Sequence, residues 1–292
     1  MTEPAARGTV AAMASTLSPR VGEAIGGAPE GARRRPRGLG RLLRAAWPPA
    51  LALAVILGAW EAWVRWRDVD PTVLPAPSIV ARAGWAERGP LASDTWVTLS
   101  EAVLGLLLAL AAAIVLGLAI DGVAWVRRSV YPLLVASQTL PIVAIAPLVV
   151  IWWGYDLGPH VAVAALYTFF PIVVGLVQGL ASSDEDANRL VRSMGAGRLA
   201  LLRRVRIPSA LPSLFTGLKV AVTYAVVAAV IAEYVGAVDG LGISMLESKN
   251  AFRTDLVFAA VAVTALLTLA MFAAVVLLER AVVPWARRGR RW

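Results

Sequence analysis

The chain has 292 residues, of which 59% are hydrophobic and only 16% are charged. Soluble domains carry nearer a quarter charged residues, so a single water-soluble domain is excluded and a membrane protein is expected. The 28 Lys and Arg outnumber the 19 Asp and Glu, which gives a formal net charge of +9. The absence of Cys and the single His, His160, exclude disulfides and argue against a histidine metal centre.

Hydropathy predicts six membrane spans, because about 20 apolar helical residues cross a hydrocarbon core about 30 Å thick. The fold is therefore expected to be all-α, a polytopic bundle of six transmembrane helices within residues 45–284. A cleaved signal peptide is the alternative for the first span, but it would need a much shorter leading segment. We expect the spans over 45–64, 102–120, 129–154, 160–180, 214–235 and 256–278.

Arginine placement predicts the orientation of the bundle. With six spans both termini lie on one side, which holds 21 of the Lys and Arg residues, against six on the other side and Lys219 near the start of the fifth span. By the positive-inside rule the richer side is cytoplasmic. Residues 1–44 are then a disordered basic cytoplasmic tail, and 285–292 a second one. The positive charge therefore indicates the orientation of the chain, and it also favours contact with anionic lipid head groups. No nucleic-acid partner is expected.

Four residues of the spans are candidates for a translocation path: Gln138, Pro141, Tyr224 and Glu233. A proline inside a helix bends its axis, and kinked helices with a polar residue line the paths of transporters. The alternative for Pro141 is that it only shapes packing. The alternative for Glu233 is a hydrated carboxylate near the outer interface. His160 is expected in an external turn without a special role.

The connecting segment, residues 182–212, lies between the fourth and fifth spans and is too polar to be a span. Ser182 followed by Glu185 predicts a capping box. A short helix over 186–194 should follow. Composition leaves two interpretations of this segment open: an amphipathic connector on the membrane surface, or a docking surface for a cytoplasmic protein.

The second half of the connecting segment is expected to contain a sharp turn and then a short helix that ends at two prolines. Gly195 and Gly197 permit a sharp turn. A second short helix is expected over 198–205. Pro208 and Pro212 should end it and redirect the chain into the fifth span.

The stretch RSMGAGRLALLRRVRIPSALPSLFTGLK, residues 192–219, resembles the cytoplasmic signature loop of permease subunits of bacterial binding-protein-dependent ATP-binding-cassette (ABC) importers. Gly195 matches the glycine of that loop, and Ile207, Leu211 and Pro212 fall in its aliphatic-x-Leu-Pro element. In LPAPSIV, QTLPIVAIAPLVVIWWG and TGLKVAVTYAVVAAVIAEYVGAVDGLG the chain resembles the nitrate, sulfonate and taurine branch. Its ending, FRTDLVFAAVAVTALLTLAMFAAVVLLERAVVPW, is most similar to permeases for thiamine-precursor pyrimidines or riboflavin.

The resemblance implies a type I (MetI-like) permease in a bacterial cell membrane, paired with a second copy. A cytoplasmic ATPase dimer would dock on the connecting segment, and an external binding protein would deliver the substrate. ATP would be bound by the partner, and no cofactor by this chain, which has no P-loop motif. The family's leading Glu-Ala-Ala falls on Arg189-Leu190-Val191, so its acidic residue is missing. The implied coupling residues are Asp186, Arg189, Leu190, Arg192, Ser193, Gly195, Ala196, Arg198, Pro208, Leu211 and Pro212.

Three other functions remain as rivals. A membrane-embedded enzyme would need paired ionisable groups, and no span is expected to pair two. A membrane scaffold would neither transport nor stimulate an ATPase, and a secondary transporter would follow an ion gradient instead of ATP. For the substrate, the resemblance favours a pyrimidine or vitamin-like heterocycle, with sulfonate, taurine or nitrate as the alternative.

Overall fold

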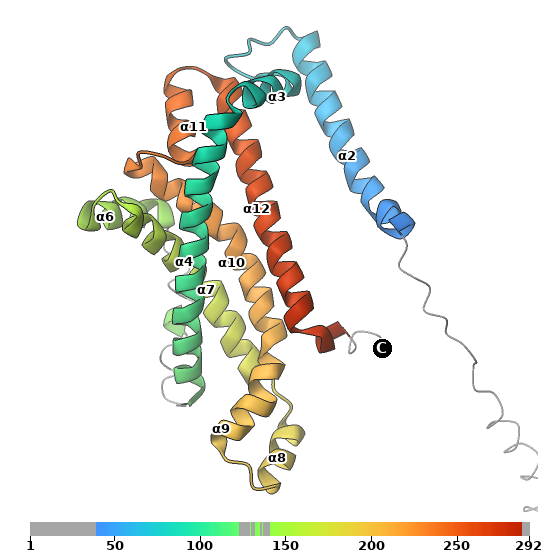
Figure 1. Ribbon diagram of the computed structural model, residues 1–292, viewed down its shortest axis with the longest axis vertical. Helices are drawn as coiled ribbons and strands as arrows, with labels where there is room; N and C mark the ends of the chain where they lie inside the picture. Colours follow the sequence, from blue (N-terminus) through green and yellow to red (C-terminus); the bar gives the residue numbers. More distant parts are fainter. Residues whose placement is uncertain (1–38, 123–128, 130–131, 135, 137–140, 288–292) are drawn as a thin grey trace, which may run out of the picture. The chain divides into compact units, whose positions relative to one another are not determined.

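The computed structural model describes residues 39–122, 129, 132–134, 136 and 141–287. Every regular element among these residues is helical, which confirms the all-α prediction. The chain divides after Ile56 into two compact units, which are described separately. The helices (Figure 1) are α2 Leu39–Trp66, α3 Pro77–Ala86, α4 Arg88–Gly122, α6 Ile142–Trp153, α7 Leu157–Ala181, α8 Glu185–Ser193, α9 Arg198–Leu201, a π-helical turn Leu202–Arg206, α10 Ile207–Gly236, α11 Leu241–Asn250, α12 Thr254–Val282 and a 3-10 turn Pro284–Arg287.

The first unit contains the beginning of α2. This helix starts at Leu39, inside the range predicted as a tail, and residues 1–38 lie outside the described part. Trp47, Leu53 and Ile56 are exposed. An apolar helix whose side chains are exposed is suited to a lipid environment.

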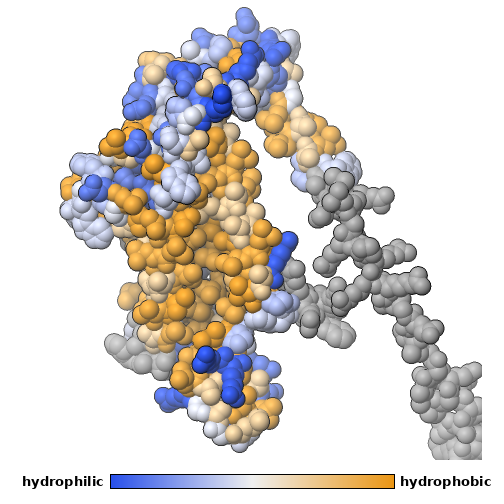
Figure 2. All heavy atoms as spheres, in the orientation of Figure 1, coloured by the Kyte–Doolittle hydropathy of each residue, from blue (hydrophilic) through white to orange (hydrophobic). Residues whose placement is uncertain are grey.

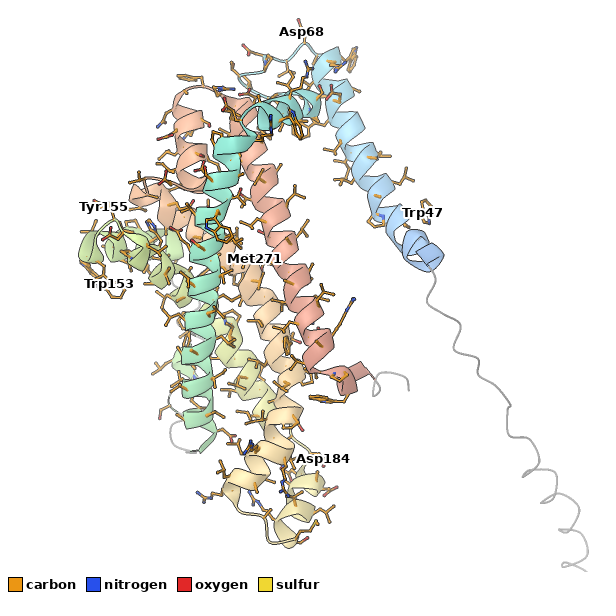
Figure 3. The ribbon with its side chains drawn as sticks, in the orientation of Figure 1. Trp47, Asp68, Trp153, Tyr155, Asp184 and Met271 are labelled. Atoms are coloured by element: carbon orange, nitrogen blue, oxygen red, sulfur yellow. The ribbon has the colours of Figure 1, made fainter. Side chains whose placement is uncertain are left out.

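In the part of the chain that the structure describes, five helices are long and apolar enough to cross a membrane, and they correspond to the predicted first, second, fourth, fifth and sixth spans. Figure 2 shows a hydrophobic belt over the middle of the second unit with hydrophilic residues at both ends. The third expected span, 129–154, falls partly outside the described residues, and its described remainder is the shorter α6. Trp153 and Tyr155 are exposed at the end of α6 (Figure 3), as aromatic residues at a membrane interface are.

The second unit is organised around α7, which packs against both α4 and α10. Small side chains such as Ala109, Ala113, Ala221 and Ala225 are fully or almost fully buried there. A Cβ built on Gly217 would lie only 2.3 Å from a backbone oxygen of α7. Small residues at such contacts let helix backbones approach closely, so α4, α7 and α10 form a tight core.

The two ends of this bundle carry different short helices. α11 packs against α4, α10 and α12 at the end where α4 begins, and α3 packs on α12 there too (Figure 1). α8 and α9 lie at the opposite end, where α4 finishes and α10 begins. We refer to these as the α11 end and the α8 end.

Ionisable residues pair between helices, a case that the expectation about single spans does not cover. Lys219 Nζ of α10 lies 2.7 Å from Glu279 Oε2 of α12, with both side chains about one quarter exposed. The two residues are far apart in sequence, so inspecting one span at a time could not find the pair.

Candidate functional site

α8 forms the first half of the connecting segment and buries none of its residues. Its N-cap is Asp184, whose carboxylate accepts hydrogen bonds from the backbone N–H groups of Asp186 at 2.9 Å and Ala187 at 3.4 Å. Figure 3 shows Asp184 at the start of the helix. Glu185 and Asp186 in the first turn also favour the helix dipole. Local bonds therefore stabilise α8, and its surface stays free to contact a partner.

The predicted helix over 186–194 is confirmed to within one residue, but the predicted capping box is wrong. The Ser182 hydroxyl donates to the carbonyl oxygen of Gly179 at 3.0 Å and so belongs to the end of α7. Asp184 lies closer to the first free N–H groups of α8 and takes the cap.

The predicted turn after α8 is confirmed at Gly195. Its φ of +82° lies in the left-handed region that favours glycine. Its N–H donates to the carbonyl oxygen of Arg192 at 2.9 Å, and the N–H of Ala196 to that of Val191 at 3.3 Å. Because nothing lies within 4 Å of a Cβ at position 195, the turn needs this glycine for its backbone and not for space.

The prediction that Pro208 and Pro212 end the second short helix is wrong. α9, the π-helical turn and α10 follow one another without a break, and together they form an apolar helix over Arg198–Gly236. The π turn changes the hydrogen-bond register directly before α10, and Pro208, which has no N–H to donate, is the second residue of α10 after that turn. The second half of the connecting segment is thus a continuous extension of a membrane span.

The structure divides the implied coupling residues into two groups. Those of the first group lie on α8, in the following turn and at the start of α9, and all are exposed except the half-buried Ala196. Those of the second group lie within α10 and are half-buried. The first group is Asp186, Arg189, Leu190, Arg192, Ser193, Gly195, Ala196 and Arg198, and the second is Pro208, Leu211 and Pro212.

One ion pair ties the connecting segment to the core of the bundle. Arg206 Nη1, at the end of the π-helical turn, lies 2.5 Å from Asp121 Oδ2 near the end of α4. Both side chains are mostly shielded, at 28% and 14% exposure. A movement of the connecting segment would therefore be transmitted to α4 as well as along α10.

At the α11 end, Glu233 of α10 is fully buried, so the hydrated interfacial interpretation is wrong. Its carboxylate accepts hydrogen bonds from Thr98 Oγ1 at 2.6 Å and from the N–H of Gly242 at 2.5 Å. A Cβ added at Gly240 or Gly242 would lie within 2.8 Å of the Glu233 side chain. The turn before α11 therefore closes tightly around this carboxylate.

His160 is buried as well, contrary to the expected external turn. α7 starts three residues before it, at Leu157, and places the ring inside the bundle. His160 Nδ1 lies 2.9 Å from Glu101 Oε1 of α4, and both side chains are almost inaccessible, at 3% and 2% exposure. The pair links α7 to α4 at the same end as Glu233.

Asp94 extends this buried polar cluster to α11. It accepts a hydrogen bond from the N–H of Gly240 at 3.4 Å and one from the hydroxyl of Ser244. The N–H of Leu241 donates to Thr98 Oγ1 at 3.0 Å. One face of α4 thus holds the α10–α11 turn and the first turn of α11, which closes the bundle at this end.

The candidate path residues lie in different surroundings. Tyr224 of α10 is 41% exposed, and its ring lies 5.0 Å from that of Tyr167 of α7. Pro141 is the exposed N-cap of α6. Gln138 lies outside the described residues. Since Tyr224 is exposed and Glu233 fully buried, these two do not share one surface.

Residues 91–287 match the protein family described as the inner membrane component of binding-protein-dependent transport systems. The chain belongs to this family. The formylaminopyrimidine transport permease ThiX of Halalkalibacterium halodurans is 38% identical to it, over 82% of this chain and 96% of that protein. The riboflavin permease RibX of Chloroflexus aurantiacus is 37% identical, over 84% and 93%. The taurine permease TauC of Escherichia coli is 29% identical, over 80% and 87%.

Membership of the family confirms the predicted permease subunit of a binding-protein-dependent ABC importer and its bacterial membrane location. Transport by this family depends on a binding protein, as its description states. The matched residues begin within α4 and include α7, α10, the connecting segment and the residues of the buried polar cluster.

Sequence reasoning missed several residues of this permease. The sequence-based predictions do not include Asp94, Thr98 and Glu101, although their spacing of four and then three residues places them on one face of a helix. That spacing is the signal that could have found the buried polar cluster. No comparable signal marks Tyr167, which contacts Tyr224 only because α7 and α10 pack together.

Proposed function

We propose that this permease forms the translocation path for a small planar heterocycle, in an ATP-driven importer whose ATP is bound and hydrolysed by a separate subunit. The observation that carries the proposal is the face shared by α7 and α10. Tyr167 and Tyr224 pair on it, with ring planes 44° apart. One helical turn along each helix from these rings lies a pocket of about 330 Å³, within the usual size range of small-molecule sites.

The chemistry of this pocket suits a neutral heterocycle. None of its eight lining residues is charged, and the hydroxyl oxygens of Ser213 and Thr216 can accept hydrogen bonds. Two relatives are named for formylaminopyrimidine and for riboflavin, which are both planar and aromatic. A sulfonate such as taurine would be expected to use a cationic partner. The lining is Pro171, Val174, Gly175, Gln178, Ser213, Thr216, Gly217 and Val220.

Uptake into proteoliposomes tests the substrate. The permease would be reconstituted with its ATPase and binding protein and supplied with labelled formylaminopyrimidine, riboflavin or taurine. We expect a heterocycle, and not taurine, to be taken up and to stimulate ATP hydrolysis. Tyr224→Ala should reduce this uptake about 3- to 10-fold, the value of one aromatic contact, whereas Tyr224→Phe keeps the ring and should not. Uptake of taurine alone, or uptake that survives ATP depletion, would refute the proposal.

We also propose that the α8 end, with both termini, faces the cytoplasm, as the arginine distribution indicates. Because the chain has no Cys, single cysteines can be introduced without a background. Ser193→Cys on α8 should react with a membrane-impermeant maleimide only after the cells are opened. Val238→Cys, which replaces an 84% exposed residue beside α11, should react in intact cells. If Ser193→Cys reacted in intact cells and Val238→Cys only in opened cells, the topology would be the opposite of the one proposed.

A second copy of the permease completes the path in this proposal. In a single chain Val220, Tyr224 and Val227 of α10 are all more than 40% exposed, so the α7–α10 face is open on one side. Chemical cross-linking of Val220→Cys in membranes should produce a dimer of this chain. Cross-links only to a different membrane protein would instead indicate a heterodimer.

A further inference from the structure

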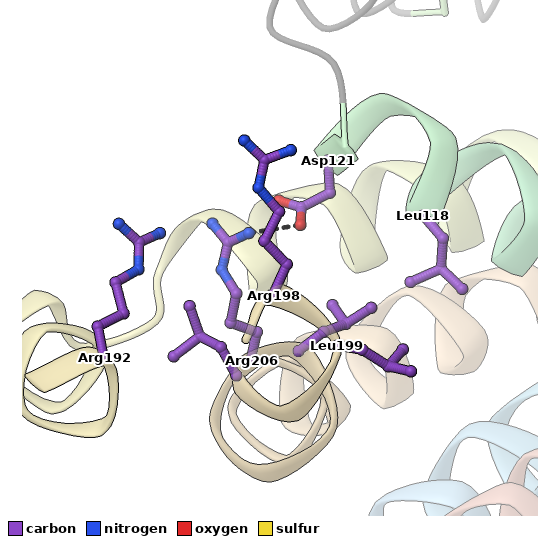
Figure 4. A pocket seen from close by; sticks show the side chains of 8 residues that line it. Leu118, Asp121, Arg192, Arg198, Leu199 and Arg206 are labelled. Atoms are coloured by element: carbon purple, nitrogen blue, oxygen red, sulfur yellow. Dashed lines mark hydrogen bonds and ion pairs between the residues drawn. The ribbon is translucent and has the colours of Figure 1, made fainter. Parts of the chain in front are cut away.

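A pocket of about 440 Å³ lies at the α8 end, between α4 and the connecting segment. Figure 4 shows the side chains of Arg192, Arg198 and Arg206 extending to the side on which Asp121 lies. The rest of the lining is hydrocarbon, from Leu118, Leu199, Leu201 and Leu202. The pocket is therefore cationic on one part of its wall and apolar on the other.

The charges of the pocket are not balanced. Arg206 is neutralised by its ion pair with Asp121. Arg192 and Arg198 form no ion pair with any residue in the described part of the chain. The pocket therefore holds two positive charges without a protein counter-charge, and it favours an anion.

Two helices that are long and apolar enough to cross a membrane contribute their ends to the pocket. The first, Arg88–Asp121, ends at Asp121, and the second, Arg198–Gly236, begins at Arg198. Both boundary residues line the pocket. Leu199, next to Arg198, is 76% exposed, which is costly in water and favourable against a lipid chain. Where such helix ends reach the lipid head groups, cationic side chains meet phosphates and neighbouring leucines meet acyl chains.

We propose that this pocket binds an anionic phospholipid. The guanidinium groups of Arg192 and Arg198 would hold its phosphate, since arginine binds phosphate oxygens with paired hydrogen bonds. The four leucines would contact the first part of its acyl chains. The bound lipid would lie between α4 and the segment proposed to receive the ATPase, so that coupling would depend on anionic lipid.

Lipid binding can be measured on the intact permease–ATPase complex in nanodiscs. The probe is dioleoyl phosphatidylglycerol at increasing mole fraction in phosphatidylcholine, with retained lipid counted by native mass spectrometry. The pocket variant combines Arg192→Gln and Arg198→Gln. The matched control combines Arg203→Gln and Arg204→Gln, which changes two exposed arginines of the same segment outside the pocket.

The pocket variant should lose about 25-fold in phosphatidylglycerol affinity, because each cation near an anionic lipid contributes about a factor of five. The control variant should keep the affinity. Asp121→Asn should raise it, because it releases Arg206 as a third cation, and a gain cannot result from misfolding. Equal losses in the pocket and control variants, or no gain in Asp121→Asn, would overturn the proposal.

Two further outcomes separate the lipid from other ligands. Inorganic phosphate in excess should not displace the lipid, because phosphate offers nothing to the leucines, and full displacement would mean a free-anion site. If the pocket variant loses the ATPase subunit even in pure phosphatidylcholine, the two arginines bind that subunit and the lipid proposal fails.

Discussion

The two ends of the bundle hold their charged residues in opposite ways. At the α11 end, Glu101, His160 and Glu233 are almost inaccessible; Glu101 pairs with His160, and Glu233 accepts two hydrogen bonds. At the α8 end, Arg189 pairs with Glu185 at 3.3 Å, but the two side chains are 76% and 82% exposed. Buried charges are stable only in one geometry, whereas exposed pairs contribute little and can exchange partners. The first end is therefore built to keep its shape, and the second is built to accept a partner.

The largest effect should follow from a change at Glu233. Glu233→Ala leaves the Gly242 N–H buried without its acceptor, at about 1–3 kcal/mol, and opens a cavity where the carboxylate packs against Gly240 and Gly242. The Thr98 hydroxyl keeps the carbonyl oxygen of Asp94 as an acceptor at 3.1 Å. We expect the apparent free energy of unfolding, measured in detergent, to fall by about 2–5 kcal/mol. Glu233→Gln keeps an acceptor oxygen, so its apparent free energy of unfolding should fall by less than half of this amount. Equal stability of the Ala variant and the unchanged permease would show that the α11 end is not held by this carboxylate.

The buried pair of His160 and Glu101 should show strong coupling. Each of His160→Leu and Glu101→Leu leaves a buried polar group without its partner, and the double variant removes both. A double-mutant cycle on the free energy of unfolding should give a coupling energy of about 1–3 kcal/mol. Additive losses would mean that the two groups do not support each other.

At the α8 end the expected effect is on transport and smaller on stability. Gly195→Val places a β-branched residue at a φ of +82°, which costs about 1–3 kcal/mol locally, and it should reorient α8 relative to α9. We expect ATP-driven uptake to drop at least 10-fold while the bundle stays folded. Gly197→Ala is the control, because Gly197 has a φ of −72° and open space around its Cβ position. Normal uptake by a fully assembled Gly195→Val complex would argue against coupling through this turn.

The smallest effect is expected for Arg189→Gln. Its ion pairs with Glu185 and Asp186 are exposed on both sides, so the free energy of unfolding should change by less than about 0.5 kcal/mol. A clear change in ATPase stimulation without a change in stability would place Arg189 in the docking surface. A large loss of stability would contradict the difference between the two ends.

Local signals explain what the sequence could reveal. The spans follow from apolar length alone, and α8 and its turn follow from acidic residues and a glycine that act within a few positions. The pairing of Glu101 with His160 joins residues 59 positions apart, and Lys219 with Glu279 depends on how α10 packs on α12. Pro208 and Pro212 misled the prediction because the π-helical turn before them changes the backbone register, and no residue type announces such a turn.

The fit of Gly240 and Gly242 around Glu233 limits how this part of the chain can diverge. Gly240 has a φ of +128°, and a methyl group at either position would overlap the carboxylate. In a library randomised at 233, 240 and 242 and selected for growth on the imported solute, glycine should therefore be invariant at both 240 and 242. A shorter acid at 233 should not admit alanine at 242, because a Cβ there would also lie 2.5 Å from the backbone oxygen of Val230. The two glycines that follow α10 are thus fixed by the helix on which they close, although a loop separates them from Glu233.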